Sequence, residues 1–245
     1  MALTKRFLLL ASFLLAGCLS HALTLSDIQT AVRRNMRDTA TDSTLQRYSD
    51  AILLDYINEE QKQLVNLTWC VEASTSYVLV AGTVYYDLPT DWLAISYVTF
   101  TDTSNNVVWL EEWSERKMYQ QDASFEANST GEPVKYFTRS PTTTAPQIAY
   151  VPIPTSASTG TVTVAYISQA TDLASASDVP FNGFTSLYPY HYSIVHGVTA
   201  RLKAVEGLTD EAKYYSDQLG IYVATMKEKY KNRPNYSPSL QAAPR

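Results

Sequence analysis

Histidines, cysteines and paired carboxylates are the side chains that most often carry catalysis or bind metals, and this sequence has few of them in a useful arrangement. Its 245 residues include three histidines and two cysteines. His191 and His196 are five residues apart on a predicted helix, which places them about 140° apart around the axis and prevents them from sharing a metal ion. We therefore assign both to helix packing or to the surface, and we predict no metal site and no cofactor.

The carboxylates and the nucleophile motifs lead to the same prediction. Adjacent strand residues point to opposite faces, so Glu111 and Glu112 cannot face one cleft as acid–base catalysis requires. Glu59 and Glu60 have the pattern of a solvated helix edge. The sequence has no phosphate-binding glycine loop, G-x-S-x-G elbow, H-E-x-x-H motif or C-x-x-C pair. We predict that the protein is not an enzyme.

The first 22 residues have the pattern of an export signal. Lys5 and Arg6 precede an apolar run, residues 7–16, and the following small residues end at Cys18, as in signals cut before a lipid-modified cysteine. The run is shorter than the roughly 20 apolar residues of a membrane-spanning helix. Three interpretations stay open: lipidation at Cys18, a start codon placed too far upstream, or an N-terminal segment retained in the working protein.

Composition is that of a folded, mildly acidic protein. Hydrophobic residues make up 45% of the chain and charged residues 18%. The net charge of −5 provides no basic field that would grip nucleic acid tightly. The chain has 18 tyrosines against 7 phenylalanines, and tyrosine suits surfaces that contact other subunits.

The sequence pattern places helices at both ends of the chain and strands between them. Ser26 and Gln29 form a capping-box pattern for a helix over 26–37, and Ser49 caps an amphipathic helix over 50–66. Short β-rich runs follow at 76–82, 84–89, 93–100, 106–113, 134–139, 147–152 and 160–168. Only a short helix after Ser114 interrupts them, which favours an antiparallel sandwich or barrel.

Two further helices are predicted near the C-terminus, over 191–207 and 209–231, with Gly207 in the C-cap position of the first. The predicted fold class is α+β, with an extended C-terminal tail at 232–245. In this organisation residues 1–22 are the leader. Residues 23–67 and 185–231 form one helical bundle, into which the antiparallel β-domain 68–184 is inserted.

Several segments together resemble the head-to-tail adaptor (connector) proteins of tailed bacteriophages, especially short-tailed phages. The matching segments are 48–64, 82–98, 131–137, 148–154 and 188–202. Within them, a Leu-Pro-x-Asp turn follows a strand ending in Tyr86, a Gly-x-Pro-x-x-Tyr segment begins at Gly131, and a Pro-x-Pro pair ends at Pro154.

The resemblance implies a structural virion protein at the head–tail junction. Such adaptors assemble in the host cytoplasm as a homo-oligomeric ring, usually a dodecamer, beneath the portal protein. They connect it to tail or nozzle proteins and leave a channel through which DNA passes without specific binding. The C-terminal segment of related adaptors extends to the portal. The residues expected to dock there are Arg233, Pro234, Tyr236, Leu240 and Arg245.

The alternative is an exported outer-membrane lipoprotein, lipidated at Cys18 and bound to the membrane through it. Its β-domain would bind a partner or a carbohydrate through exposed Trp92, Trp109 and Trp113. Aromatic residues in strands belong more often to a core. Incorporation of labelled palmitate would favour this alternative, whereas a soluble ring would favour the adaptor.

Overall fold

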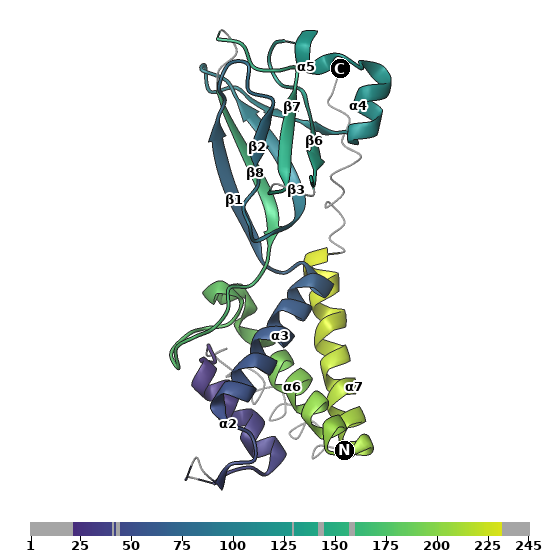
Figure 1. Ribbon diagram of the computed structural model, residues 1–245. Coiled ribbons are helices and arrows are strands. Elements are labelled where there is room, and N and C mark those ends of the chain that lie inside the picture. The colour runs from purple at the N-terminus through teal and green to yellow at the C-terminus, as the bar shows by residue number, and fades with distance from the viewer. Residues whose placement is uncertain are drawn as a thin grey trace, which may run out of the picture. The chain divides into compact units, whose positions relative to one another are not determined.

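The computed structural model describes residues 22–40, 42, 45–128, 130–141, 145–156 and 160–231, and the chain folds into two compact units. Among the described residues, the helical unit comprises those in 22–64 and 171–224. The β unit comprises those in 65–170 and 225–231 (Figure 1). Each unit therefore combines segments from two distant parts of the sequence.

Helix α6 is the centre of the helical unit. The unit is built from α2 (Leu25–Met36), α3 (Asp50–Thr68), α6 (His191–Val205) and α7 (Thr209–Met226), with short helices η2 (Phe181–Gly183) and η3 (Thr185–Tyr190) before α6. Ile194, Val195, Val198 and Leu202 of α6 are all at most 1% exposed. Helix α2 packs against α6, and side chains of α3 and α7 also contact it. The predicted C-cap is confirmed, because Gly207 has a left-handed φ of 77° directly after α6.

The beginning of α2 differs from the prediction. Thr24, not Ser26, is the N-cap: its hydroxyl accepts a hydrogen bond from the Asp27 amide at 3.3 Å. The Asp27 carboxylate in turn accepts one from the Thr24 amide at 2.9 Å, which completes a capping box. The capping partner is therefore an aspartate three residues after the cap, and Ser26 lies in the first turn.

Helix α3 begins and packs largely as its sequence predicts. The Ser49 hydroxyl accepts a hydrogen bond from the Ile52 amide at 3.3 Å, so the predicted cap is confirmed. Leu53, Ile57 and Leu64 are buried and form the apolar face of this amphipathic helix. Ile52, next to Leu53 in the sequence, is 44% exposed.

Two four-stranded sheets form the β unit, and the predicted α+β fold with an antiparallel sandwich is confirmed. The first sheet has the order β1 (Glu72–Val78), β8 (Thr161–Ser168), β3 (Trp92–Thr101) and β4 (Val107–Trp109). The second has the order β2 (Tyr85–Asp87), β7 (Gln147–Val151), β6 (Lys135–Arg139) and β5 (Glu111–Glu112). All pairs of neighbouring strands are antiparallel except β5 and β6.

Alternation along the strands creates two apolar layers. Tyr136, Ile148 and Tyr150 of the second sheet share one cluster with Val98, Phe100, Val162 and Val164 of the first sheet. Their sequence neighbours point to the other side of the second sheet, because successive strand residues alternate. There Phe137, Ala149 and Val151 pack against Met118 of α4 (Glu115–Gln121) and Phe125 of α5 (Phe125–Asn128). Ser114 caps α4, as predicted.

Candidate functional site

The residues predicted to dock on a portal lie outside the part of the chain that the structure describes. These are Arg233, Pro234, Tyr236, Leu240 and Arg245, and Cys18 also lies outside it. Their assignments stay predictions. The described residues contain three kinds of feature that could form a functional site: buried polar groups, a pocket on the helical unit, and the exposed surface of the first sheet.

The buried cysteine and histidines have packing roles. Cys70 is 6% exposed, and burial raises the pKa of its thiol to about 11, so it stays protonated near neutral pH. His191 is fully buried; its Nδ1 accepts a hydrogen bond from the Leu23 amide at 3.0 Å, and burial lowers its pKa to about 4. Among the described residues, no three histidine, cysteine or acidic side chains are grouped closely enough to hold a metal ion.

His196 packs between α6 and α7. Its ring centroid lies 5.9 Å from that of Tyr215 and 5.7 Å from that of Tyr222. Burial lowers the pKa of His196, which favours a neutral ring among these aromatic groups. Both histidines were predicted to lie in helix packing or at the surface, and both take the packing role.

The prediction of a solvated helix edge is wrong for Glu60. Glu60 is 3% exposed, and its carboxylate lies directly against Gly197 of α6. The Arg201 guanidinium bridges both acidic side chains: Nη2 is 2.8 Å from the Glu59 Oε2, and Nη1 is 3.8 Å from the Glu60 Oε2. Glu59 is exposed, as predicted, whereas burial raises the pKa of Glu60 to about 7.

Sequence reasoning missed this buried cluster because its members come from different helices. The only available indication was that Gly197 and Arg201 are four residues apart, and so share one face of the predicted helix 191–207. Because glycine has no side chain, Gly197 leaves room beside Arg201 for a carboxylate on a neighbouring helix. Nothing in the sequence identified Glu60, rather than another acidic residue, as that neighbour.

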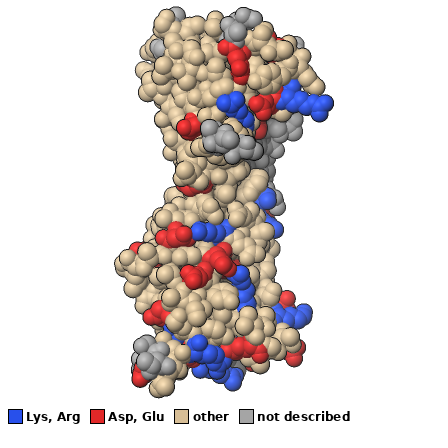
Figure 2. All heavy atoms as spheres, viewed as in Figure 1, with Lys and Arg blue, Asp and Glu red and all other residues tan. Residues whose placement is uncertain are grey.

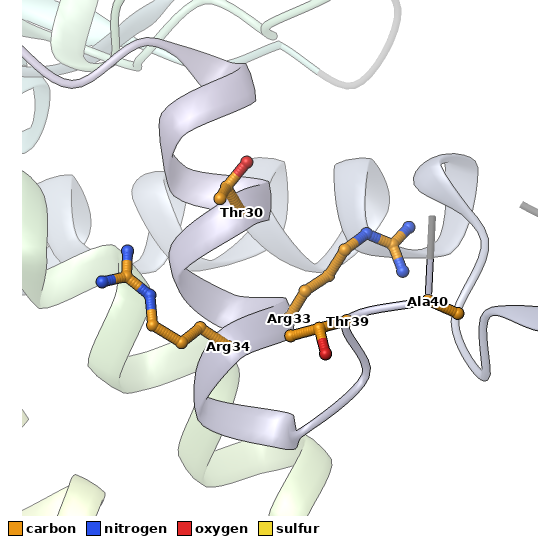
Figure 3. Close-up of a pocket in the computed structure, with 5 residues that line it drawn as sticks. All are labelled: Thr30, Arg33, Arg34, Thr39 and Ala40. Atoms are coloured by element: carbon orange, nitrogen blue, oxygen red, sulfur yellow. The ribbon is translucent and has the colours of Figure 1, made fainter. Parts of the chain in front are cut away.

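A pocket of about 320 Å³ lies at the surface of the helical unit. Its lining residues are Thr30, Arg33, Arg34, Thr39 and Ala40 (Figure 3). Figure 3 shows that the two guanidinium groups point in opposite directions. Arg33 is already paired with Asp38 at 3.1 Å and with Asp50 at 2.6 Å. The pocket therefore does not present two converging cations to an anion.

Charged side chains of both signs are interspersed over the helical unit (Figure 2). Several of the cations are paired within the unit: Lys62 lies 2.5 Å from Asp172, and Lys203 lies 2.7 Å from Glu211. In the β unit, most of the surface visible in Figure 2 is uncharged, and the charged side chains gather near α4. Neither pattern is that of a basic surface that grips phosphates.

The outer face of the first sheet carries one charged residue over four adjacent strands, Glu72 at the start of β1. Tyr77, Val98 and Val162 belong to or pack on the core, so the residues that alternate with them point outward. The outward residues are Glu72, Ser74, Ser76 and Val78 on β1, Thr161, Thr163 and Ala165 on β8, Tyr97, Thr99 and Thr101 on β3, and Val107 and Trp109 on β4. The Ser76 and Thr163 hydroxyls are 3.1 Å apart, which places them on one face.

Only one of the three tryptophans offered as a binding platform is exposed. Trp109 is 66% exposed, and its ring lies 4.8 Å from that of Tyr97. Trp92 and Trp113 are half-buried and pack against the two apolar clusters, and their indole nitrogens are buried. The ammonium groups of Lys117 and Lys135 lie 3.9 and 3.6 Å from the centre of the Trp113 ring. The exposure that the lipoprotein alternative required is therefore found for Trp109 and is wrong for Trp92 and Trp113.

No helix among the described residues is both long and apolar enough to span a membrane. The model of the family described as SU10 adaptor protein matches residues 23–239, whereas no curated protein matches the chain. The family match includes the segments that resembled phage adaptors, and it confirms that resemblance. Because it spans most of the sequence, this chain belongs to the SU10 adaptor protein family, a family of phage head-to-tail adaptors.

Proposed function

We propose that the protein assembles as a homo-oligomeric ring beneath the portal of a phage head and joins the portal to the tail. The family match over residues 23–239 carries this proposal, since it makes the chain a structural adaptor of the virion. The dodecamer is the ring size that we expect. The role that we propose is structural, and the pairing of Arg33 with Asp38 and Asp50 within the fold is consistent with it.

Each part of the chain has a place in this proposal. Residues 23–67 and 185–231 form the bundle of the ring, and residues 68–184 form the inserted β-domain. Residues 232–245 extend from the ring to the portal, with Tyr236 and Leu240 as apolar anchors. Residues 1–22 precede the matched region, and in this proposal portal binding does not require them.

DNA would pass through the ring without being held by it. The net charge is −5, and a mildly acidic channel wall does not attract the negatively charged phosphate backbone of DNA. The ion pairs of the helical unit support the same behaviour, because paired cations such as Lys62 and Lys203 are less available to phosphates.

Truncation at each end of the chain tests the portal contact. We expect removal of residues 232–245 to abolish binding to isolated portal protein, measured by co-sedimentation. Tyr236→Ala with Leu240→Ala in the full chain should weaken binding at least tenfold, because two apolar anchors are lost. Removal of residues 2–22 is the control and should leave binding unchanged. Undiminished binding after removal of the C-terminal segment would overturn the assignment.

A further inference from the structure

The first sheet ends in two strands that have no partner on their outer side among the described strands. These are β1 and β4, at opposite ends of the order β1, β8, β3, β4. In an antiparallel sheet, alternate residues of an edge strand direct their backbone N–H and C=O groups away from the sheet. Both edges therefore offer main-chain groups to a further strand.

Most of the features with which proteins block such pairing are missing from these edges: neither strand contains a lysine or a proline, although β4 is short. Lysines, prolines and charges protect natural edge strands. The seven residues of β1 include one charged side chain, Glu72 at its start, and β4 has none. All three residues of β4 are exposed: Val107 by 59%, Val108 by 46% and Trp109 by 66%. Exposed apolar residues on an unprotected edge favour addition of a strand.

The second sheet provides a comparison within the same unit. Its edge strand β5 consists of two glutamates, and its other edge strand, β2, has three residues and ends at Asp87, two residues before Pro89. Charges and a nearby proline are among the usual means of preventing edge pairing. Strand β4 is as short as β2 but has neither a charge nor a proline, so the two sheets differ in the chemistry of their edges.

The directions of the strands make the two free edges complementary. Strands β1, β8, β3 and β4 alternate in direction, so β1 and β4 run opposite to each other. If β4 of one copy lies beside β1 of the next, the antiparallel pattern continues across the junction. A contact between two different surfaces is heterologous, and repetition of such a contact can close a ring.

We propose that β4 of one copy pairs with β1 of the next copy, so that the first sheets form one continuous belt around the ring. This inference rests on the proposed function, since it requires a ring. The outward residues of β1, such as Ser74 and Ser76, would then lie beside Val107 and Trp109 of the neighbour. Since β4 has no charged residue, Glu72 of β1 would not meet a like charge on the neighbouring strand.

Cysteine cross-linking tests the pairing directly. In a Cys18→Ser background, Val107→Cys is combined in turn with Ser74→Cys, Ser76→Cys or Val78→Cys, since a disulfide forms only between closely opposed residues. We expect one combination to give, on oxidation, a ladder of covalent species at multiples of 27.4 kDa. Each single cysteine, and Val134→Cys with Ser76→Cys, should give no ladder, because Val134 is 49% exposed but lies on neither edge.

An edge-blocking substitution gives an independent readout. Val108→Lys should shift the native mass from the ring to the single chain without lowering the thermal unfolding midpoint. Val134→Lys should leave the ring intact. A wild-type ring with neither a ladder nor an effect of Val108→Lys would overturn the edge pairing and leave the proposed function standing. A wild-type chain that never forms a ring would refute the proposed function itself. If Val108→Lys keeps the ring but loses tail-protein binding, the edge receives a tail strand and the inference is wrong.

Discussion

Glu60 is an acidic residue that the helical unit buries against Gly197, and its environment predicts how stability depends on pH. Burial raises its pKa from the ordinary 4.5 to about 7, although Arg201 acts in the opposite direction. The folded state therefore binds the Glu60 proton more tightly than the unfolded state does. The contribution of Glu60 to the free energy of unfolding is greatest when its carboxyl is protonated in both the folded and the unfolded state. This contribution falls as the pH rises from about 4.5 through about 7.

Glu60→Gln should remove most of this dependence. The amide does not ionise, so we expect the variant to be more stable than the wild type at pH 8 by about 3 kcal/mol, with little difference near pH 4.5. Thermal unfolding across this pH range measures it. Glu59→Gln is the matched control, because Glu59 is exposed and contacts the same arginine. If the unfolding midpoints of the wild type and of Glu60→Gln changed with pH in parallel, the raised pKa of a buried Glu60 carboxyl would be contradicted.

Two helical glycines should respond in opposite ways to alanine. A Cβ at Gly197 would collide with the Glu60 carboxylate, whereas a Cβ at Gly220 meets nothing within 4 Å. We expect Gly197→Ala to lower the free energy of unfolding by about 1–3 kcal/mol through overpacking. Gly220→Ala should raise it by about 0.5–1 kcal/mol, because alanine loses less backbone entropy in a helix. Denaturant unfolding distinguishes the two, and equal effects would show that α3 and α6 are not closely packed at Gly197.

At the scale of single elements, the N-terminus of α2 depends on the capping box that Thr24 forms with Asp27. Thr24→Ala removes the side-chain acceptor for the Asp27 amide, and we expect a loss of about 1 kcal/mol in the free energy of unfolding. Ser26→Ala, at the cap that the sequence pattern suggested, should change it by less than about 0.5 kcal/mol, as exposed substitutions usually do. A larger effect at Ser26 than at Thr24 would contradict the observed cap.

Helices and strands could largely be predicted from the sequence, because periodicity records which face is buried. Their pairing could not. The predicted strand 106–113 divides at Leu110, whose amide donates to Val98 in the first sheet while the Glu111 amide donates to Val134 beside the second. A buried leucine in a β-rich run does not show where the chain changes sheets. The parallel pairing of β5 with β6 depends equally on contacts between distant segments.

The candidate sites follow the same division. The packing roles of His191 and His196 could be predicted from helical spacing, whereas the burial of Glu60 could not, because it depends on the docking of α3 against α6. The alternating pattern of the single strands predicts which of their residues point away from the core. It does not predict that four separate strands lie side by side and together form the outer face of the first sheet.

At the scale of the whole molecule, the features on its two units suit an assembling protein. The helical unit pairs many of its charges internally, and the β unit exposes a sheet face whose one charged residue is Glu72, with two edges that contain no lysine or proline. Unprotected edges are a liability in a protein that stays monomeric. They are expected where a neighbouring copy covers them, which is the arrangement that we propose for the ring.

The native mass of the purified full-length chain, alone and with portal protein, tests the central claim most directly. We predict a soluble species of several hundred kilodaltons at an integer multiple of 27.4 kDa, alone or once portal is added, and a further increase when the ring docks on the portal. A mass of 27.4 kDa both with and without portal would contradict the ring-forming adaptor.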